Sequence, residues 1–201
     1  MRYFLILFIF YSSLFGVTIN DSLLKIHATL VPKIYLMDYQ YKEKIDNNSI
    51  VIAIIYKNLD YKNALSLKNK IDSKYSDGMK SYKIVVKLTP YNKVENTNAN
   101  IYYLFPSTHE NIKKVIQKAN ENQAITFSYL NNDLRYGVMV SLKIGNKVKP
   151  ILNLNAVKLH NISFRPILLN ISSIYSKTIS NALENSKIKS FYNYKKLCVS
   201  V

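Results

Sequence analysis

Continuous apolar runs and helically spaced apolar positions alternate through the first two thirds of the chain. Ile50–Tyr56 (IVIAIIY) is apolar throughout, which is typical of a strand buried on both faces in a parallel sheet. Ile101–Phe105 is a second such run, Tyr82–Leu88 alternates as a strand does, and Ala124–Ser128 predicts a short strand. These patterns predict four strands separated by segments long enough for helices.

Helix signals lie before and between the strands. Asn20 or Asp21 is expected to cap a first helix, which Pro32 should kink or end. Asp60 is expected to cap a second helix, and Ser107-Thr108-His109-Glu110 forms a capping-box pattern for a third. The apolar positions recur at helical spacing: Leu23, Leu24, His27 and Leu30; Ala64, Leu67 and Ile71; Ile112, Val115, Ile116 and Ala119.

The pattern changes after Gly137. Val138–Ile144 and Val148–Leu154 predict a hairpin, with Gly145-Asn146 as a two-residue primed turn. A short helix should follow and end at Asn161, which can take the left-handed cap position. Ser163 should begin a second short apolar helix.

This order predicts an α/β protein: a single layered domain with a mostly parallel sheet flanked by helices, then an antiparallel C-terminal hairpin at the sheet edge and short helices. The expected divisions are a signal peptide over residues 1–16, the α/β domain over 20–175 and a basic, Tyr-containing tail over 176–201. The N-terminal segment has one basic residue, an apolar run and a small residue at Gly16, so we expect export to the periplasm. An uncleaved membrane anchor is the alternative.

Composition narrows the function further. The formal net charge is +16, yet arginine, which is preferred for bidentate phosphate and base contacts, occurs only three times. We therefore expect no nucleic-acid binding, and membrane contact only through an uncleaved signal or the basic tail. Cys198 is the only cysteine, so the exported domain has to fold without an intrachain disulfide.

Catalytic and cofactor signatures are missing from the sequence. The three histidines, His27, His109 and His160, lack the spacing of a zinc site, and four glycines do not build a phosphate-binding loop. Asn131–Asp133 is expected to form a turn, with a cation site as the alternative. We therefore expect no catalytic residues, no metal, no cofactor and no enzymatic activity.

The C-terminal third carries a family resemblance. Tyr136-Gly137-Val138-Met139 is similar to the first strand of the signature of the YfiR-like (DUF4154) proteins, and Leu152-Asn153-Leu154 to its Ile-Asn-Leu type motif. Ala156, Asn161-Ile162 and Leu168-Leu169 stand where the family has Ala, Gly-Leu and Leu-Leu. In element order the resemblance runs from Leu23 to Tyr175.

Two departures accompany this resemblance. Pro150-Ile151 and Arg165-Pro166 replace pairs that are common in the family, and the family's disulfides are absent here. Pro150 has no N–H to donate, so its nitrogen should lie at an edge or face away from the ladder.

The resemblance implies a periplasmic regulator that forms a homodimer and binds the periplasmic sensor domain of an inner-membrane signalling protein. A diguanylate cyclase restrained in this way would link the protein to cyclic-di-GMP signalling. An alternative is a periplasmic ligand-binding domain for a small anion, held at the carboxyl ends of the strands near Lys57–Asp60 and Pro106–Thr108.

A partner surface is expected on the C-terminal hairpin and its helices. The residues proposed for it are apolar and lie in the segment that carries the resemblance: Leu152, Leu154, Ile162, Phe164 and Leu168. The competing interpretation is that all five belong to the core.

Overall fold

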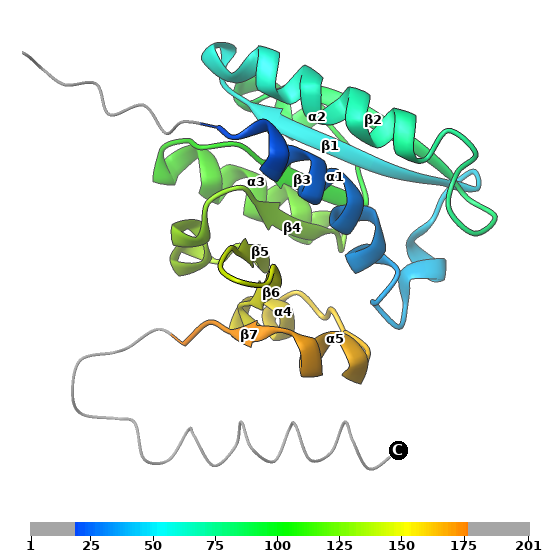
Figure 1. Cartoon of the computed structure of the whole chain (residues 1–201), viewed down its shortest axis with the longest axis vertical. Coiled ribbons are helices and arrows are strands. Elements are labelled where there is room, and N and C mark those ends of the chain that lie inside the picture. The colour runs from blue at the N-terminus through cyan, green and yellow to red at the C-terminus, as the bar shows by residue number, and fades with distance from the viewer. Residues whose placement is uncertain (1–18, 177–201) are drawn as a thin grey trace, which may run out of the picture.

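One seven-stranded sheet organises the chain. The computed structural model describes residues 19–176, and the strands follow the order β2-β1-β3-β4-β5-β6-β7 (Figure 1). The predicted signal segment and all of the predicted tail except Ser176 lie outside the described residues. The strand bounds are β1 (Ser49–Tyr56), β2 (Lys83–Pro90), β3 (Ile101–Leu104), β4 (Ile125–Ser128), β5 (Val140–Lys143), β6 (Lys149–Leu152) and β7 (Ser173–Ile174).

The first five strands are parallel, as the continuous apolar runs predicted. The hairpin of β5 and β6 is antiparallel, but it is not the edge of the sheet, because β7 adds one more strand parallel to β6. The edge position predicted for the hairpin is therefore wrong. β7 pairs only with Ile151 and Leu152, so its ladder does not need an N–H donor from Pro150.

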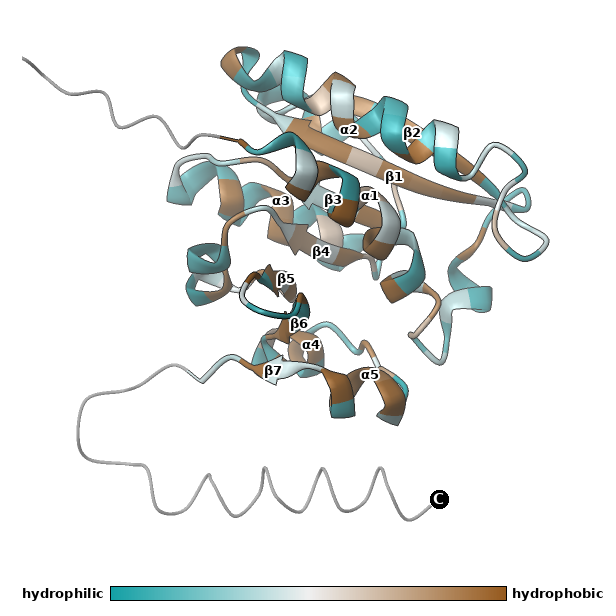
Figure 2. Ribbon diagram, in the orientation of Figure 1, coloured by the Kyte–Doolittle hydropathy of each residue, from teal (hydrophilic) through white to brown (hydrophobic). Residues whose placement is uncertain are grey.

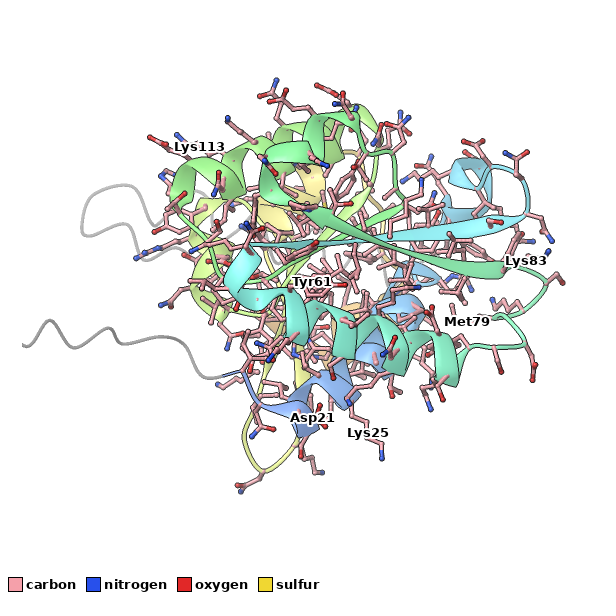
Figure 3. All side chains as sticks on the ribbon, turned by 90° about the horizontal axis from the view of Figure 1, so that it is seen from above. Asp21, Lys25, Tyr61, Met79, Lys83 and Lys113 are labelled. Carbon is pink, nitrogen blue, oxygen red and sulfur yellow. The ribbon has the colours of Figure 1, made fainter. Side chains whose placement is uncertain are left out.

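Within residues 19–176, five α-helices cover the sheet: α1 (Asp21–Tyr35), α2 (Tyr61–Lys74), α3 (His109–Glu121), α4 (Leu154–Leu159) and α5 (Pro166–Ile171). α1 and α2 lie on one face and α3 lies on the other, as Figure 3 shows from above. Asn20 caps α1 by accepting from Leu23 N, and Thr108 caps α3 by accepting from Asn111 N.

α1 does not end at Pro32. The helix continues to Tyr35 although proline cannot donate to the preceding turn. Val31, Ile34 and Tyr35 are buried in the last turns, and the burial of their side chains offsets the lost hydrogen bond.

The sheet separates two apolar clusters. The larger lies beneath α1 and α2 and continues into the C-terminal elements, with Ile52, Tyr103 and Phe127 among its buried residues. The smaller lies beneath α3 and includes Ile55 and Val115. β1 contributes to both clusters, which explains why its sequence is apolar without alternation.

The C-terminal loops differ from their predicted geometry. Residues 144–148 connect β5 to β6, and neither Gly145 nor Asn146 takes a positive φ, so the predicted primed two-residue turn is wrong. The last pair of the hairpin places Lys143 opposite Lys149, and like charges in that position disfavour a longer ladder. The second short helix begins at Pro166 rather than Ser163.

Candidate functional site

The five residues predicted to contact a partner are all buried. Leu152 lies in β6, Leu154 in α4 and Leu168 in α5, while Ile162 and Phe164 lie in the segment between the two helices. All five belong to the larger apolar cluster. A partner that approaches this segment meets their neighbours instead, so the candidate surface moves to the opposite faces of the same elements.

Exposed aliphatic residues occupy those opposite faces. On α5, Leu168 and Leu169 point into the core, whereas Ile167 and Ile171 are 62% and 56% exposed. Ile167 and Ile171 are four positions apart and therefore share one side of the helix. Ile174 on β7 and Leu159 at the end of α4 are exposed as well. We call Leu159, Ile167, Ile171 and Ile174 the C-terminal apolar residues; Figure 2 shows the hydrophobic colouring of α5 at the end of the sheet away from β2.

A buried ion pair fixes the segment next to these residues. Lys44 Nζ lies 2.7 Å from Asp38 Oδ2, and both side chains are almost fully enclosed. The other oxygen of Asp38 accepts from Gln40 N and from Ser163 N. The Asp38 carboxylate therefore connects the segment after α1 to the segment that precedes α5.

Backbone hydrogen bonds reinforce this connection. Tyr39 N donates to Ser163 O, and Arg165 N donates to Met37 O, both at 2.8 Å. The Arg165 guanidinium also lies over the ring of Tyr39, whose own side chain is exposed. The N-terminal end of α5 is thus held through its N-cap residue Arg165 by contacts with the chain after α1, more than 120 positions earlier.

Asn153 explains the middle position of the Leu-Asn-Leu motif. Its Oδ1 accepts from Ala156 N and caps α4, while its Nδ2 donates to Leu134 O at 2.7 Å. Because the side chain is buried, both of its polar atoms need partners inside the protein. The sequence marked the motif but not this double role.

The carboxyl ends of the parallel strands carry two acidic side chains. Asp60 follows β1, and burial raises the pKa of its carboxyl group. Asp133 lies in the 3₁₀ helix Asn131–Tyr136 after β4, where it accepts from Ser128 Oγ; its burial also raises its pKa. The predicted turn is therefore a helical turn. Neither Lys57–Asp60 nor Pro106–Thr108 lines the surface groove between α1 and α2 or the one beside Tyr39.

The three histidines lie in different surroundings, each with its own contacts. His27 is buried on α1, where Nδ1 lies 2.9 Å from Tyr103 Oη, and burial lowers its pKa to about 3. His109 stacks on Tyr136, and His160 contacts Asn120. Within residues 19–176, no three His, Cys, Asp or Glu side chains come close enough together to hold a metal ion.

Comparison with known structures identifies the class of fold. A conserved domain protein from Vibrio cholerae O1 biovar El Tor str. N16961 superposes with a TM-score of 0.54 at 12% identity, over 76% of this chain and 60% of that one. CD0873 from Clostridium difficile, described as a substrate binding protein with adhesive properties, gives a TM-score of 0.52 at 12% identity, over 75% and 58%. The chain therefore spans about three fifths of each of these two proteins and shares their α/β fold.

The particular family follows from the sequence match. The YfiR/HmsC-like family (DUF4154) matches residues 41–173, more than half of the chain, so the protein belongs to that family. Membership in this family supports, in general terms, the role of a periplasmic regulatory protein. No curated protein matches the sequence. None of the helices within residues 19–176 has the length and apolar character needed to cross a membrane.

Proposed function

We propose that the protein is a non-enzymatic periplasmic regulator that binds the periplasmic sensor domain of an inner-membrane signalling protein, such as a diguanylate cyclase. It reaches the periplasm through the N-terminal signal segment. The C-terminal apolar residues form the contact. The observation that carries this proposal is the pair Ile167 and Ile171, exposed on a helix whose other side is anchored in the core.

Burial of these side chains supplies the binding free energy. Full burial of one leucine or isoleucine contributes about 1.5–3 kcal/mol, so the four C-terminal apolar residues make a useful centre for a contact surface. Because α5 is fixed by the Asp38 connection, little conformational entropy is lost when a partner binds. The regulator restrains the sensor if it binds one sensor conformation more tightly than the other.

A cellular measurement tests the proposal. We expect the double variant Ile167→Ser, Ile171→Ser, expressed in a strain that lacks the native gene, to leave cyclic-di-GMP at the level of the deletion strain. The matched control is Leu59→Ser with Val85→Ser, because Leu59 is 94% exposed and both residues lie on other elements, η2 (Asn58–Asp60) and β2. The control should restore regulation.

The result has a clear contrary outcome. If the isoleucine variant restores normal cyclic-di-GMP while its melting temperature matches that of the control, the proposed contact surface is wrong. If the deletion itself leaves cyclic-di-GMP unchanged, the proposed signalling role is wrong.

A ligand-binding domain for a small anion, at the carboxyl ends of the strands, receives less support. Lys57–Asp60 and Pro106–Thr108, where the anion was expected, line neither the groove between α1 and α2 nor the groove beside Tyr39. The contact made by the C-terminal apolar residues therefore remains the function that we propose.

A further inference from the structure

A second surface lies on the layer formed by α1 and α2. The two helices pack side by side on one face of the sheet, and an open groove of about 850 Å³ runs between them. Asp21 contacts Ser66, and Thr29 O accepts from Tyr75 Oη, so the helices run in the same direction along the groove. Ala28 and Leu65 contribute apolar surface to its wall.

The groove is strongly basic. Four of its lining residues are lysines, Lys25, Lys62, Lys70 and Lys74, and Asp21 is its one acidic residue. Asp21 Oδ1 lies 2.9 Å from Lys70 Nζ and accepts from Ser66 Oγ at 3.1 Å. The hydrogen bond from Lys70 is the main reason that the pKa of Asp21 is lowered. Lys70 is therefore paired with the groove's own carboxylate, and the charge of Lys25 also lowers the pKa of Asp21, although Lys25 lies beyond ion-pair distance.

The other three lysines of the groove form no ion pair of this kind within residues 19–176. Lys25, Lys62 and Lys74 are exposed, and within residues 19–176 none of them has a carboxylate at ion-pair distance. They belong to two helices and line one groove, but Lys62 and Lys74 are twelve positions apart on α2, about 18 Å along the helix axis, so a ligand meets these lysines in succession along the groove. Figure 3 shows Asp21 and Lys25 on the outer side of the helical layer, away from the sheet.

We propose that the α1/α2 groove binds a phosphate-bearing anion. A phosphate group offers several strong acceptor oxygens, and lysine binds phosphate as a point charge. A phosphate monoester at neutral pH carries nearly two charges, so one phosphate group balances more lysine charge than one carboxylate does. Ser73 and Asn69 also line the groove and offer hydrogen-bond donors to the remaining oxygens.

Two sources can supply this chemistry. One is the headgroup of an anionic phospholipid, and the other is a soluble phosphate compound. The site lies on other elements than the C-terminal apolar residues, so this proposal goes beyond the regulatory contact and does not depend on it.

Binding to two probes tests the groove in the full chain. The first probe is soluble pyrophosphate, measured by calorimetry in 100 mM salt. The second is vesicles of phosphatidylcholine with 30% phosphatidylglycerol, measured by co-sedimentation, with pure phosphatidylcholine vesicles as the blank. We expect binding to at least one probe, and a loss of at least tenfold in affinity for the triple variant Lys25→Gln, Lys62→Gln, Lys74→Gln.

The control variant changes the same net charge elsewhere. Lys83→Gln, Lys113→Gln and Lys114→Gln replace exposed lysines on β2 and α3, outside the groove. This variant should bind within twofold of the native chain. Binding to pyrophosphate assigns a soluble ligand, and binding to vesicles alone assigns a lipid headgroup.

Two results would overturn the proposal. One is an absence of binding to both probes, and the other is an equal loss in the groove and control variants, since an equal loss reflects only net charge. Matching melting temperatures for the two triple variants separate loss of the groove from loss of the fold.

Discussion

The parallel half of the sheet and the C-terminal elements hold together in different ways. β1 pairs with β2 through eight residues in register, and β1 is enclosed by side chains on both faces. β5 is joined to β4 by a single registered pair, Phe127 with Val140. Side chains replace the missing ladder, because Thr126 Oγ1 accepts from Met139 N and Ser141 Oγ donates to Ser128 O.

This difference has a functional consequence. A long ladder with helices on both faces leaves few large apolar side chains exposed, whereas short elements cannot enclose both of their faces. The helices α4 and α5 have six residues each, and one face of α5 stays open to solvent. The C-terminal elements therefore combine rigid attachment with an uncovered apolar face, which is what a docking surface needs.

The largest effect is expected from a substitution that removes the ion pair between Asp38 and Lys44. Asp38→Ala leaves Lys44 as a buried charge without its partner, which should lower the free energy of unfolding by about 3–5 kcal/mol. The matched control is Asp72→Ala, which removes a half-exposed i,i+4 pair with Lys68 and should cost at most about 1 kcal/mol. Urea unfolding measures both, and equal losses would contradict the role given to Asp38.

Neighbouring residues on α5 sharpen the contrast between its two faces. Leu168→Ala creates a cavity in the core and should cost about 2–5 kcal/mol. Ile167→Ala, one position earlier, should change stability by less than about 0.5 kcal/mol because its side chain is mostly exposed. A large loss for Ile167→Ala in urea unfolding would show that α5 is oriented differently.

A change of pH tests the buried centre of the parallel half. His27 has a pKa near 3 in the folded protein and an ordinary value of 6.5 when unfolded, so the unfolded chain binds more protons between these values. Its contribution to stability is complete above pH 6.5 and is lost as the pH falls, by about 1.4 kcal/mol per pH unit.

The variant His27→Gln isolates this effect. Between pH 7 and pH 5 the native chain should lose about 2 kcal/mol more than the variant in urea unfolding. Burial raises the pKa of the Tyr103 hydroxyl, which lies against the imidazole, so Tyr103 adds nothing to the difference. Parallel pH profiles would show that His27 is not the group responsible.

The last comparison concerns the helix caps of the two regions, of which the α3 cap has the smallest expected effect. Asn153→Ala removes the cap of α4 and the side-chain donor to Leu134 O, which keeps only its hydrogen bond from Gly137 N, so it should cost about 1–3 kcal/mol. Thr108→Ala removes an exposed cap of α3 and should cost about 0.5–1 kcal/mol. If the two losses in thermal unfolding are equal, the second contact of Asn153 contributes nothing.

The parallel half could be predicted largely from the sequence. The apolar run of β1 and the helical spacing of apolar residues on α3 predict which side chains are buried, and each element is long enough for its pattern to be recognised. The β4 strand and the caps at Asn20 and Thr108 also lie where local chemistry placed them or one residue away. The left-handed conformation of Asn161, with φ of 53°, follows from the same local chemistry.

The candidate site needed the tertiary structure. Ile167, Leu168 and Leu169 are all apolar, so a six-residue helix gives no period that separates the buried face from the exposed one. The sequence prediction placed the partner surface in this segment and selected Leu152, Leu154, Ile162, Phe164 and Leu168, which the fold encloses. Likewise, no local pattern shows that Asp38 and Ser163 meet.

The sequence by itself determined the class of fold, the positions of the long elements and the family. The tertiary structure decided which faces of the short elements remain open, where β7 closes the sheet, and that lysines from two helices line one groove. The physical reason is range: periodicity and capping depend on neighbours within a few residues, whereas exposure and charge clustering depend on which distant segments pack together.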